Sequence, residues 1–234
     1  MSFDLQELLA CEPQECWRKV PGRMTFPWGS GADGLPLAVV KRFEGDLARD
    51  VWYERFRGRR RSPARREFDG LRGLGAAGLP VPEAFGWIER GSRSLVVMGY
   101  VPHRETVAQR LIGADATERR RLVGEVAQIT ARMHAAGWYH RDLYLNHFVL
   151  GPGGGLVLLD LGRARWERQP RRRWHHKDLG ALLHGDVGDH PLGAREWLRG
   201  LVIYADGRGI RARTPRRALA AGALRFRARI ARRA

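Results

Sequence analysis

The order of strand and helix patterns along the 234 residues predicts an α+β fold in two lobes. Short apolar runs bounded by glycine and proline, which are typical of strands, dominate up to residue 98. Helical periodicity dominates after a break that contains Gly99, Tyr100 and Pro102. We therefore expect a β-rich N-terminal lobe over residues 1–98, a hinge over 99–102 and a mainly helical C-terminal lobe over 103–234.

The N-terminal lobe should combine antiparallel strands with one helix. Strands are predicted over residues 17–20, 37–41, 84–88 and 94–98, with a glycine-rich turn between the first two and a polar, basic connection as far as residue 61. Ser62 followed by Pro63 predicts a helix start, because the hydroxyl caps free N–H groups and proline suits the first helical position. This helix should end near residues 75–78. Glu67 lies one turn before Leu71 and therefore borders the inward face.

The C-terminal lobe should be built from helices and one hairpin. Helices are predicted over residues 117–136, 172–183 and 194–204, and from 215 to the end. In the first of them, Leu122, Val126, Ile129 and Met133 recur at helical steps, and Gly137 ends the pattern. Residues 148–150 and 156–159 are short apolar strands joined by a turn rich in glycine, which predicts a hairpin.

The charge of the chain is strongly basic. The formal net charge is +17, and three of the 42 basic residues are lysines, at positions 19, 41 and 177. Lysine is a compact point charge whereas arginine is a planar fork, so each lysine is worth inspection. A basic surface attracts polyanions such as nucleic acid, anionic lipid headgroups and phosphorylated sugars. Nucleic acid is not expected as the partner, because no aromatic-studded binding motif accompanies the arginines.

Cysteine usage and hydropathy indicate the cellular location. Cys11 and Cys16 have no His/Cys cluster around them, which predicts neither a metal site nor a disulfide framework. The N-terminal segment lacks a signal-peptide pattern, and no apolar run has the length of a membrane span. We expect a cytoplasmic monomer with at most peripheral membrane contact. The basic amphipathic segment from Pro215 fits either a helix on an anionic membrane surface or a docked helix with a solvated basic face.

Two acidic motifs stand beside the predicted hairpin. His140-Arg141-Asp142 precedes its first strand, and Asp160-Leu161-Gly162 follows its second strand. A carboxylate next to a buried strand can be held rigidly, as a general base or a metal ligand requires. Phosphoryl transfer needs a group that orients the attacking hydroxyl and another that holds a divalent ion. Asp142 and Asp160 could divide these two tasks.

These motifs resemble the protein-kinase-like superfamily, which has a His-Arg-Asp catalytic loop and an Asp-Phe-Gly metal motif, here Asp-Leu-Gly. The resemblance implies a two-lobed kinase-like fold with ATP and Mg²⁺ as cofactors. It implies that Asp142 is the catalytic base and that Asp160 is a magnesium ligand. His140 and Arg141 complete the catalytic motif, where we expect them to support the loop. Asp178 resembles the buried acid that braces this loop from a following helix.

The resemblance extends to the nucleotide side. It implies that Lys41, at the end of an apolar strand, binds phosphate and that Glu67 is its ion-pair partner, with Glu54 and Asp69 as competing candidates. Gly99 and Tyr100 would offer backbone groups to adenine, although a plain linker is the alternative. The phosphate-covering loop stays open between Gly22 and the segment 29–31, because neither reproduces the spaced glycines of a protein kinase.

A narrower resemblance is to the lipopolysaccharide core kinases that act on heptose or Kdo. Residues 133–139, which lead into His-Arg-Asp, and the basic residues 171–174, which lead into Lys177-Asp178-Leu179, are similar to that family. The family also resembles this chain in having histidine at the position of His147, where protein kinases have a metal-binding asparagine. Imidazole is a poor ligand for magnesium, so Asn146 and His147 both remain candidates for the metal.

The resemblance implies an enzyme that phosphorylates a hydroxyl of the lipopolysaccharide inner core, on heptose or Kdo. The anionic inner membrane would be the surface on which the substrate is presented. Two alternatives stay open, because a fold does not determine a substrate. The chain could be a kinase for a protein or another small molecule, or a catalytically inactive nucleotide-binding module, which the histidine and the irregular glycine loop would fit.

Overall fold

The computed structural model describes residues 3–46, 48–56, 60–183 and 192–232, which form two compact units. The first unit comprises the described residues of Met1–Gly75, Pro82–Pro102 and Asp160–Gly162. The second comprises those of Ala76–Val81, His103–Leu159 and Arg163–Ala234. The first contains an antiparallel sheet and the second is mainly helical, so the predicted two-lobed, kinase-like α+β fold is confirmed. The predicted ranges 1–98, 99–102 and 103–234 stay a prediction.

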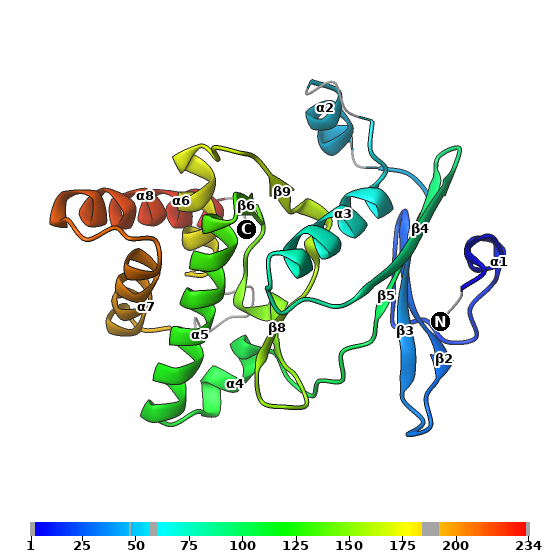
Figure 1. Cartoon of the computed structure of the whole chain (residues 1–234), viewed down its shortest axis with the longest axis horizontal. Helices are drawn as coiled ribbons and strands as arrows, with labels where there is room; N and C mark the ends of the chain where they lie inside the picture. Colours follow the sequence, from blue (N-terminus) through cyan, green and yellow to red (C-terminus); the bar gives the residue numbers. More distant parts are fainter. Residues whose placement is uncertain (1–2, 47, 57–59, 184–191, 233–234) are drawn as a thin grey trace. The chain divides into compact units, whose positions relative to one another are not determined.

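A five-stranded antiparallel sheet forms the centre of the first unit (Figure 1). Its strands, in the spatial order β1-β2-β3-β5-β4, are β1 (Arg18–Val20), β2 (Arg23–Ser30), β3 (Pro36–Phe43), β4 (Ala84–Arg90) and β5 (Arg93–Gly99). The predicted pair 84–88 and 94–98 is confirmed, and each strand is longer than expected. In the register of β3 and β5, Lys41 lies opposite Val96.

Strand β2 was not predicted, because its sequence carries the turn residues Pro27 and Gly29. The register explains how the sheet accepts the proline. Strand β1 pairs with β2 only as far as Thr25, so Pro27 lies beyond it and its missing N–H breaks no hydrogen bond to that neighbour.

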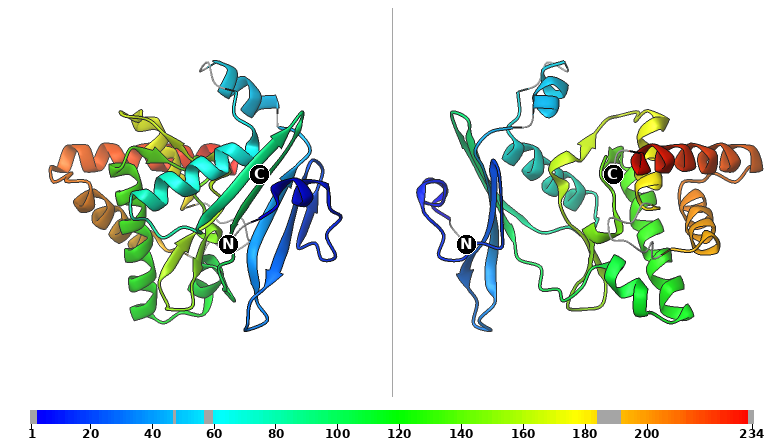
Figure 2. Two further views of the ribbon diagram at one scale, coloured as in Figure 1. Left: turned by 45° about the vertical axis from the view of Figure 1, so that its right-hand side comes forward. Right: turned by 180° about the vertical axis from the view of Figure 1, so that it is seen from behind.

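The two faces of the sheet have different partners (Figures 1 and 2). Helix α1 (Leu5–Ala10) lies on one face and buries Leu8 and Leu9 against alternate residues of β3 and β5, among them Val40. Helix α3 (Pro63–Ala76) lies on the other face. Because side chains alternate along a strand, Lys41 points away from the face that Val40 occupies. A lysine buried to 8% exposure is thereby directed to the side of α3.

The helix start at Ser62 is confirmed, because its hydroxyl accepts a hydrogen bond from the N–H of Arg65 at 3.2 Å. Helix α2 (Ala48–Phe56) replaces the predicted polar connection. The burial of its side chains is the opposite of the usual pattern, because the acidic side chain of Glu54 is buried, whereas Trp52 and Phe56 are exposed. The apolar residues of this helix do not gather into one stripe, so periodicity did not indicate it.

The second unit is built from five α-helices and two short β-pairs among its described residues. The helices are α4 (Val107–Gly113), α5 (Ala116–Ala135), α6 (Arg172–Ala181), α7 (Ala194–Gly207) and α8 (Arg213–Ala231). The pairs are β6 (Trp138–Tyr139) with β9 (Arg165–Trp166), and β7 (Phe148–Leu150) with β8 (Leu156–Leu158). The predicted hairpin and the four predicted helices are confirmed. Helix α4 was not predicted, and neither were β6 and β9, which are too short to show an alternating sequence pattern.

Helix α8 docks closely on α6 (Figure 2). A Cβ added to Gly180 would approach the carbonyl oxygen of Ala223 to 2.6 Å, and one added to Gly222 would approach Nδ1 of His176 to 2.4 Å. Leu219 is buried on the same side. The apolar stripe of the C-terminal segment therefore packs against protein, and its exposed face is basic. No helix within the described ranges is long and apolar enough to cross a bilayer.

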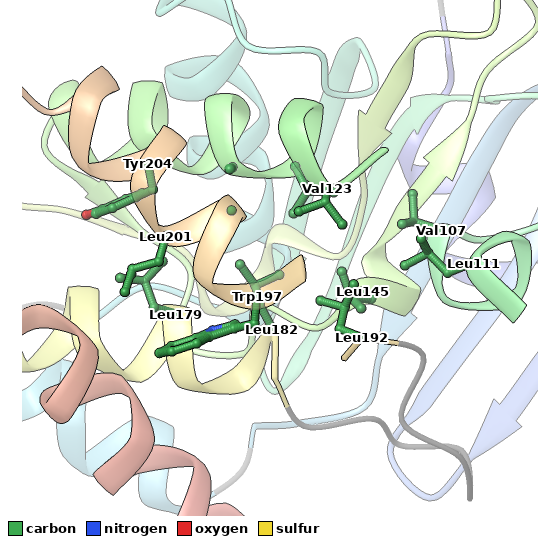
Figure 3. A pocket seen from close by; sticks show the side chains of 13 residues that line it. Val107, Leu111, Val123, Leu145, Leu179, Leu182, Leu192, Trp197, Leu201 and Tyr204 are labelled. Carbon is green, nitrogen blue, oxygen red and sulfur yellow. The ribbon is translucent and has the colours of Figure 1, made fainter. Parts of the chain in front are cut away.

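An apolar cavity of about 40 Å³ lies inside the second unit (Figure 3). Its described lining comes from α4, α5, α6 and α7, with Trp197 and Leu201 of α7 prominent. Leu145, from the segment that follows Asp142, also lines it. The loop that carries the predicted catalytic acid is thus anchored through an apolar side chain to the helical core.

Candidate active site

Both predicted acidic motifs contain strained backbone. Among the residues that the structure describes, Arg141 (φ 74°) and Asp160 (φ 56°) are the two non-glycine positions with positive φ. Such conformations cost on the order of 1–3 kcal/mol each and concentrate at functional sites. The surrounding structure must therefore hold both positions in place, and the contacts of each motif show how.

In the first unit, Lys41 is held between two carboxylates. Its ammonium donates to Glu67 Oε1 on α3 and lies 3.3 Å from Asp160 Oδ1. Burial opposes the charge of the lysine, but the charges of Asp160 and Glu67 prevail and raise the pKa of Lys41. Glu67 is 1% exposed, whereas the Asp160 side chain is 32% exposed. Asp160 thus keeps an accessible face for a ligand.

The competing acids have other partners. Glu54 and Asp69 both pair with Arg61, at 3.0 and 3.2 Å. Arg23, which no sequence pattern indicated, lies with its guanidinium 3.9 Å from Asp160 Oδ1. Arg23 directly follows Gly22 in the β1–β2 turn, whereas Gly29 lies at the end of β2 that leads to β3. The Gly22 turn thus lies beside the arginine that approaches Asp160, and the choice of phosphate-covering loop stays a prediction.

The hinge residues are tied to the sheet through their N–H groups. The N–H of Gly99 donates to the carbonyl of Glu83 at 2.8 Å, and that of Tyr100 donates to the carbonyl of Leu37 at 3.3 Å. The Tyr100 ring also lies 5.6 Å from that of Trp17. These contacts fix the segment, and its predicted role toward adenine stays a prediction.

In the second unit, Asp178 of α6 holds the catalytic loop by its backbone. Oδ2 accepts the N–H of His140 and Oδ1 accepts the N–H of Arg141, each at 2.7 Å. Asp178 is fully buried, and burial alone would raise its pKa. The hydrogen bonds from His134 and from the backbone of His140 outweigh burial and lower the pKa of Asp178. Two charge-assisted hydrogen bonds to Asp178, one from the strained Arg141 and one from the residue before it, therefore hold this backbone in place.

A second layer supports Asp178. His134 Nε2 lies 3.1 Å from Asp178 Oδ2, and His134 Nδ1 lies 2.7 Å from the hydroxyl of Tyr204 on α7. Burial lowers the pKa of His134, so the ring is neutral. Because a carboxylate only accepts, Nε2 carries the proton and the Tyr204 hydroxyl donates to Nδ1. His175 stacks on this ring with centroids 4.3 Å apart, and burial lowers its pKa to about 3.

The Asp142 carboxylate is flanked by two cations. Arg163 donates from Nη1 to Oδ2, and the ammonium of Lys177 lies 3.6 Å from Oδ1. Lys177 also donates to the backbone carbonyl of Arg141. The guanidinium of Arg141 lies over the ring of Trp174, 5.5 Å from its centroid. Asp142 is thus fixed in orientation while a quarter of its side chain stays exposed.

The two candidate metal residues that follow Asp142 differ in their contacts. His147 donates from Nδ1 to the backbone carbonyl of Asp142 at 2.9 Å, which stabilises the turn of the loop. The side-chain oxygen of Asn146 is buried and accepts no hydrogen bond within the described part of the chain. An unpaired buried amide oxygen is the kind of hard ligand that magnesium prefers. No group of three His, Cys, Asp or Glu side chains in the described residues forms a ready metal site.

Several contacting residues could not be selected from the sequence. Arg23 and Arg163 are two among many arginines, and nothing marks them as different. Lys177 had a signal, since lysine is rare in this chain. His134 precedes the motif by six positions on α5, and Tyr204 comes from a helix much later in the chain. Their contacts depend on tertiary packing, which no local pattern encodes.

Comparison with known proteins finds three similar chains that are lipopolysaccharide core heptose(I) kinases. The chain is 34% identical over 160 residues to the lipopolysaccharide core heptose(I) kinase WaaP of Pseudomonas aeruginosa, covering 60% of this chain and 59% of that protein. It is 40% identical over 97 residues to a WaaP of Escherichia coli, covering 38% and 36%. It is 29% identical over 158 residues to WaaP of Escherichia coli strain K12, covering 60% and 59%. The chain thus spans about three fifths or less of the length of these relatives.

A family profile extends over more of the chain. The profile of the lipopolysaccharide kinase (Kdo/WaaP) family matches residues 34–204. This range includes Lys41, Glu67, Asp142, Asp160 and Asp178, and therefore reaches both acidic motifs and the helix that braces the first of them. The match covers well over half of the sequence, and the chain belongs to the lipopolysaccharide kinase (Kdo/WaaP) family.

Proposed function

We propose that this chain is a phosphotransferase that moves a phosphoryl group from ATP to a sugar hydroxyl of the lipopolysaccharide inner core, on heptose or Kdo. The observation that carries the proposal is Lys41, a buried ammonium held between Glu67 and Asp160. A buried, rigidly placed cation beside an accessible carboxylate suits the phosphates of a nucleotide and their metal ion. Family membership and the relatives named as heptose kinases support the sugar acceptor.

The residues suit magnesium as the metal. Asp160 offers a partly exposed carboxylate and Asn146 a buried oxygen without a hydrogen bond, and oxygen ligands are those that magnesium prefers. When bound, magnesium would neutralise charge on the phosphate oxygens. In this proposal Lys41 binds phosphate, Glu67 orients Lys41, and His147 keeps the loop in shape through the Asp142 carbonyl.

Asp142 is proposed as the general base. Its carboxylate is oriented by Arg163, and its backbone follows two residues whose N–H groups Asp178 accepts. A base so held would accept the proton of a sugar hydroxyl within hydrogen-bond reach. His140 and Arg141 would serve by keeping the loop in its strained conformation.

The location of the reaction is part of the proposal. A net charge of +17, with a basic outer face on α8, would draw the chain to the anionic inner membrane, where a lipid-linked sugar is presented. We propose a cytoplasmic monomer in peripheral contact with that membrane. Nucleic acid is not proposed as a partner.

Mapping the acceptor tests the proposal. The purified chain is incubated with ATP, magnesium and, separately, heptose-containing core, Kdo-containing core and a mixed protein substrate, and the phosphate is located by mass spectrometry. The expected result is one phosphoryl group on one core sugar. Phosphate on protein alone would favour a protein kinase. Magnesium-dependent nucleotide binding without transfer to any acceptor would favour an inactive binding module.

A further inference from the structure

We propose that Lys177 is a catalytic residue, whose ammonium donates a hydrogen bond to an oxygen of the phosphoryl group as it passes to the sugar. The inference rests on the proposed function and adds a group to the acceptor side of the site. Lys177 comes from helix α6, outside both acidic motifs. It is one of three lysines in the chain, and Lys41 is the proposed phosphate ligand on the nucleotide side.

The position of Lys177 is fixed by its contacts. Its ammonium donates to the backbone carbonyl of Arg141 and lies 3.6 Å from Asp142 Oδ1. An ammonium carries three N–H donors, and the carbonyl accepts one of them. The side chain is 21% exposed, so solvent or a ligand can reach it. A cation with a donor to spare therefore stands beside the proposed base.

The other cations near Asp142 have different contacts. The residues between Asp142 and His147 include neither lysine nor arginine. The guanidinium of Arg141 lies over Trp174, and that of Arg163 contacts the opposite carboxylate oxygen, Oδ2. Phosphoryl transfer spreads negative charge over three oxygens, and its catalysis is positioning plus electrostatic stabilisation. Lys177 is the lysine that the second unit places at this acid.

The distances connect Lys177 to the reacting atoms. A general base works at about 2.6–3.2 Å from the hydroxyl oxygen. The ammonium of Lys177 lies 3.6 Å from Asp142 Oδ1, so a hydroxyl that donates to Oδ1 would lie on the side of Lys177. The oxygen of that hydroxyl is the atom that bonds to phosphorus. As the oxygen–phosphorus bond forms, the hydroxyl proton passes to Asp142, and the bond to the leaving diphosphate breaks with its electron pair. Lys177 keeps its proton throughout.

The charge state of Lys177 supports this role and makes it testable. Burial lowers the pKa of Lys177 below the ordinary lysine value, and Arg163 and Arg141 act in the same direction. The carboxylates of Asp142 and Asp178 oppose this effect. The ammonium form exists below the lowered pKa and is lost as the pH rises through it. Negative charge delivered beside Lys177 should raise that pKa again.

Three lysines allow a direct measurement of the contact. The chain is labelled with ¹³C at lysine Cε, and the signals are assigned with Lys19→Met and Lys177→Met. The Lys177 signal is titrated alone, with magnesium ADP, and with magnesium ADP plus aluminium fluoride, a mimic of the phosphoryl group in transfer. We expect the pKa of Lys177 to rise with aluminium fluoride and to stay unchanged with magnesium ADP alone.

The Lys41 signal separates the two ways in which the experiment can fail. A response of Lys41 to nucleotide, with no response of Lys177 to aluminium fluoride, would overturn the inference and leave the proposed function standing. If neither lysine responds, nucleotide does not bind as proposed, and both statements fail. The titration itself uses the unaltered protein, and the variants serve only to assign its three lysine signals.

Kinetics supply a second test. Lys177→Met should lower kcat about 100-fold while the affinity for magnesium ATP stays unchanged. Lys177→Arg should retain part of the activity and abolish the fall of kcat at high pH that Lys177 causes, because a guanidinium does not lose its proton. Lys19→Met, at an exposed position in β1, is the matched control and should behave as wild type. Full kcat in Lys177→Met, or an unchanged alkaline fall in Lys177→Arg, would contradict the inference.

Discussion

Single residues in this chain hold charge where burial would normally remove it. Lys41 stays charged because two carboxylates surround it, and Asp178 stays charged because three hydrogen bonds converge on it. His134 shows the reverse, since burial keeps it neutral, and the Asp178 carboxylate, which only accepts, assigns its proton to Nε2. Each of these states depends on a named partner, so substitution of the partner has a predictable direction.

The first prediction concerns Glu67. Glu67→Gln leaves Lys41 with Asp160 as its remaining anion, and breaking a buried pair costs about 3 kcal/mol. We expect the free energy of unfolding, measured by urea denaturation at neutral pH, to fall by that order. Glu89→Gln, at an exposed strand end, is the matched control and should leave it unchanged. Equal stability of the two variants would show that the buried pair does not hold α3 to the sheet.

The second prediction concerns His175 and acid. Its pKa is lowered to about 3, chiefly by burial and also by the charge of Arg208, so the unfolded chain takes up a proton near pH 6.5 that the folded chain does not. The stability due to this group is therefore complete above pH 6.5 and declines as the pH falls toward 3. His175→Gln should show a shallower loss of Tm between pH 7 and pH 4.5, and exposed His103→Gln should keep the wild-type slope. Identical slopes in all three proteins would refute this account.

At the scale of elements, local patterns predicted what local chemistry determines. The cap at Ser62, the periodicity of α5 and the glycine turn of the β7–β8 hairpin each act within a few residues, and all three are confirmed. Strand β2 and helix α2 were missed because tertiary context decides them. In β2, the turn residues lie beyond the part of the strand that pairs with β1. In α2, the aromatic residues are exposed.

The third prediction concerns the helix that braces the loop. Asp178→Asn would direct an N–H₂ group at backbone N–H groups of His140 or Arg141, so at least one buried donor loses its acceptor. We expect a loss of about 3 kcal/mol in the free energy of unfolding and faster amide exchange at these two positions. Asp206→Asn removes a surface carboxylate paired with Arg216 and should cost far less. Slow exchange retained in Asp178→Asn would mean that another contact holds the loop.

At the scale of the whole molecule, the motifs that predicted the site lie in different units. Lys41 was selected by rarity and Glu67 by its spacing, and the structure brings these two together with Asp160 in the first unit. The second unit collects Asp142, Arg163 and Lys177. The arginines could not have been chosen from sequence, because the chain offers so many and their positions follow from packing. The roles of all these residues stay predictions.

The central claim is that Asp142 receives the proton of the acceptor while other residues hold the nucleotide. The most direct measurement is the single-turnover rate of phosphoryl transfer by Asp142→Asn at saturating magnesium ATP, with nucleotide affinity measured on the same protein. The account predicts a rate lower by about 10²–10⁴-fold with unchanged affinity. A rate equal to that of the wild-type protein would remove Asp142 from the mechanism and contradict the account.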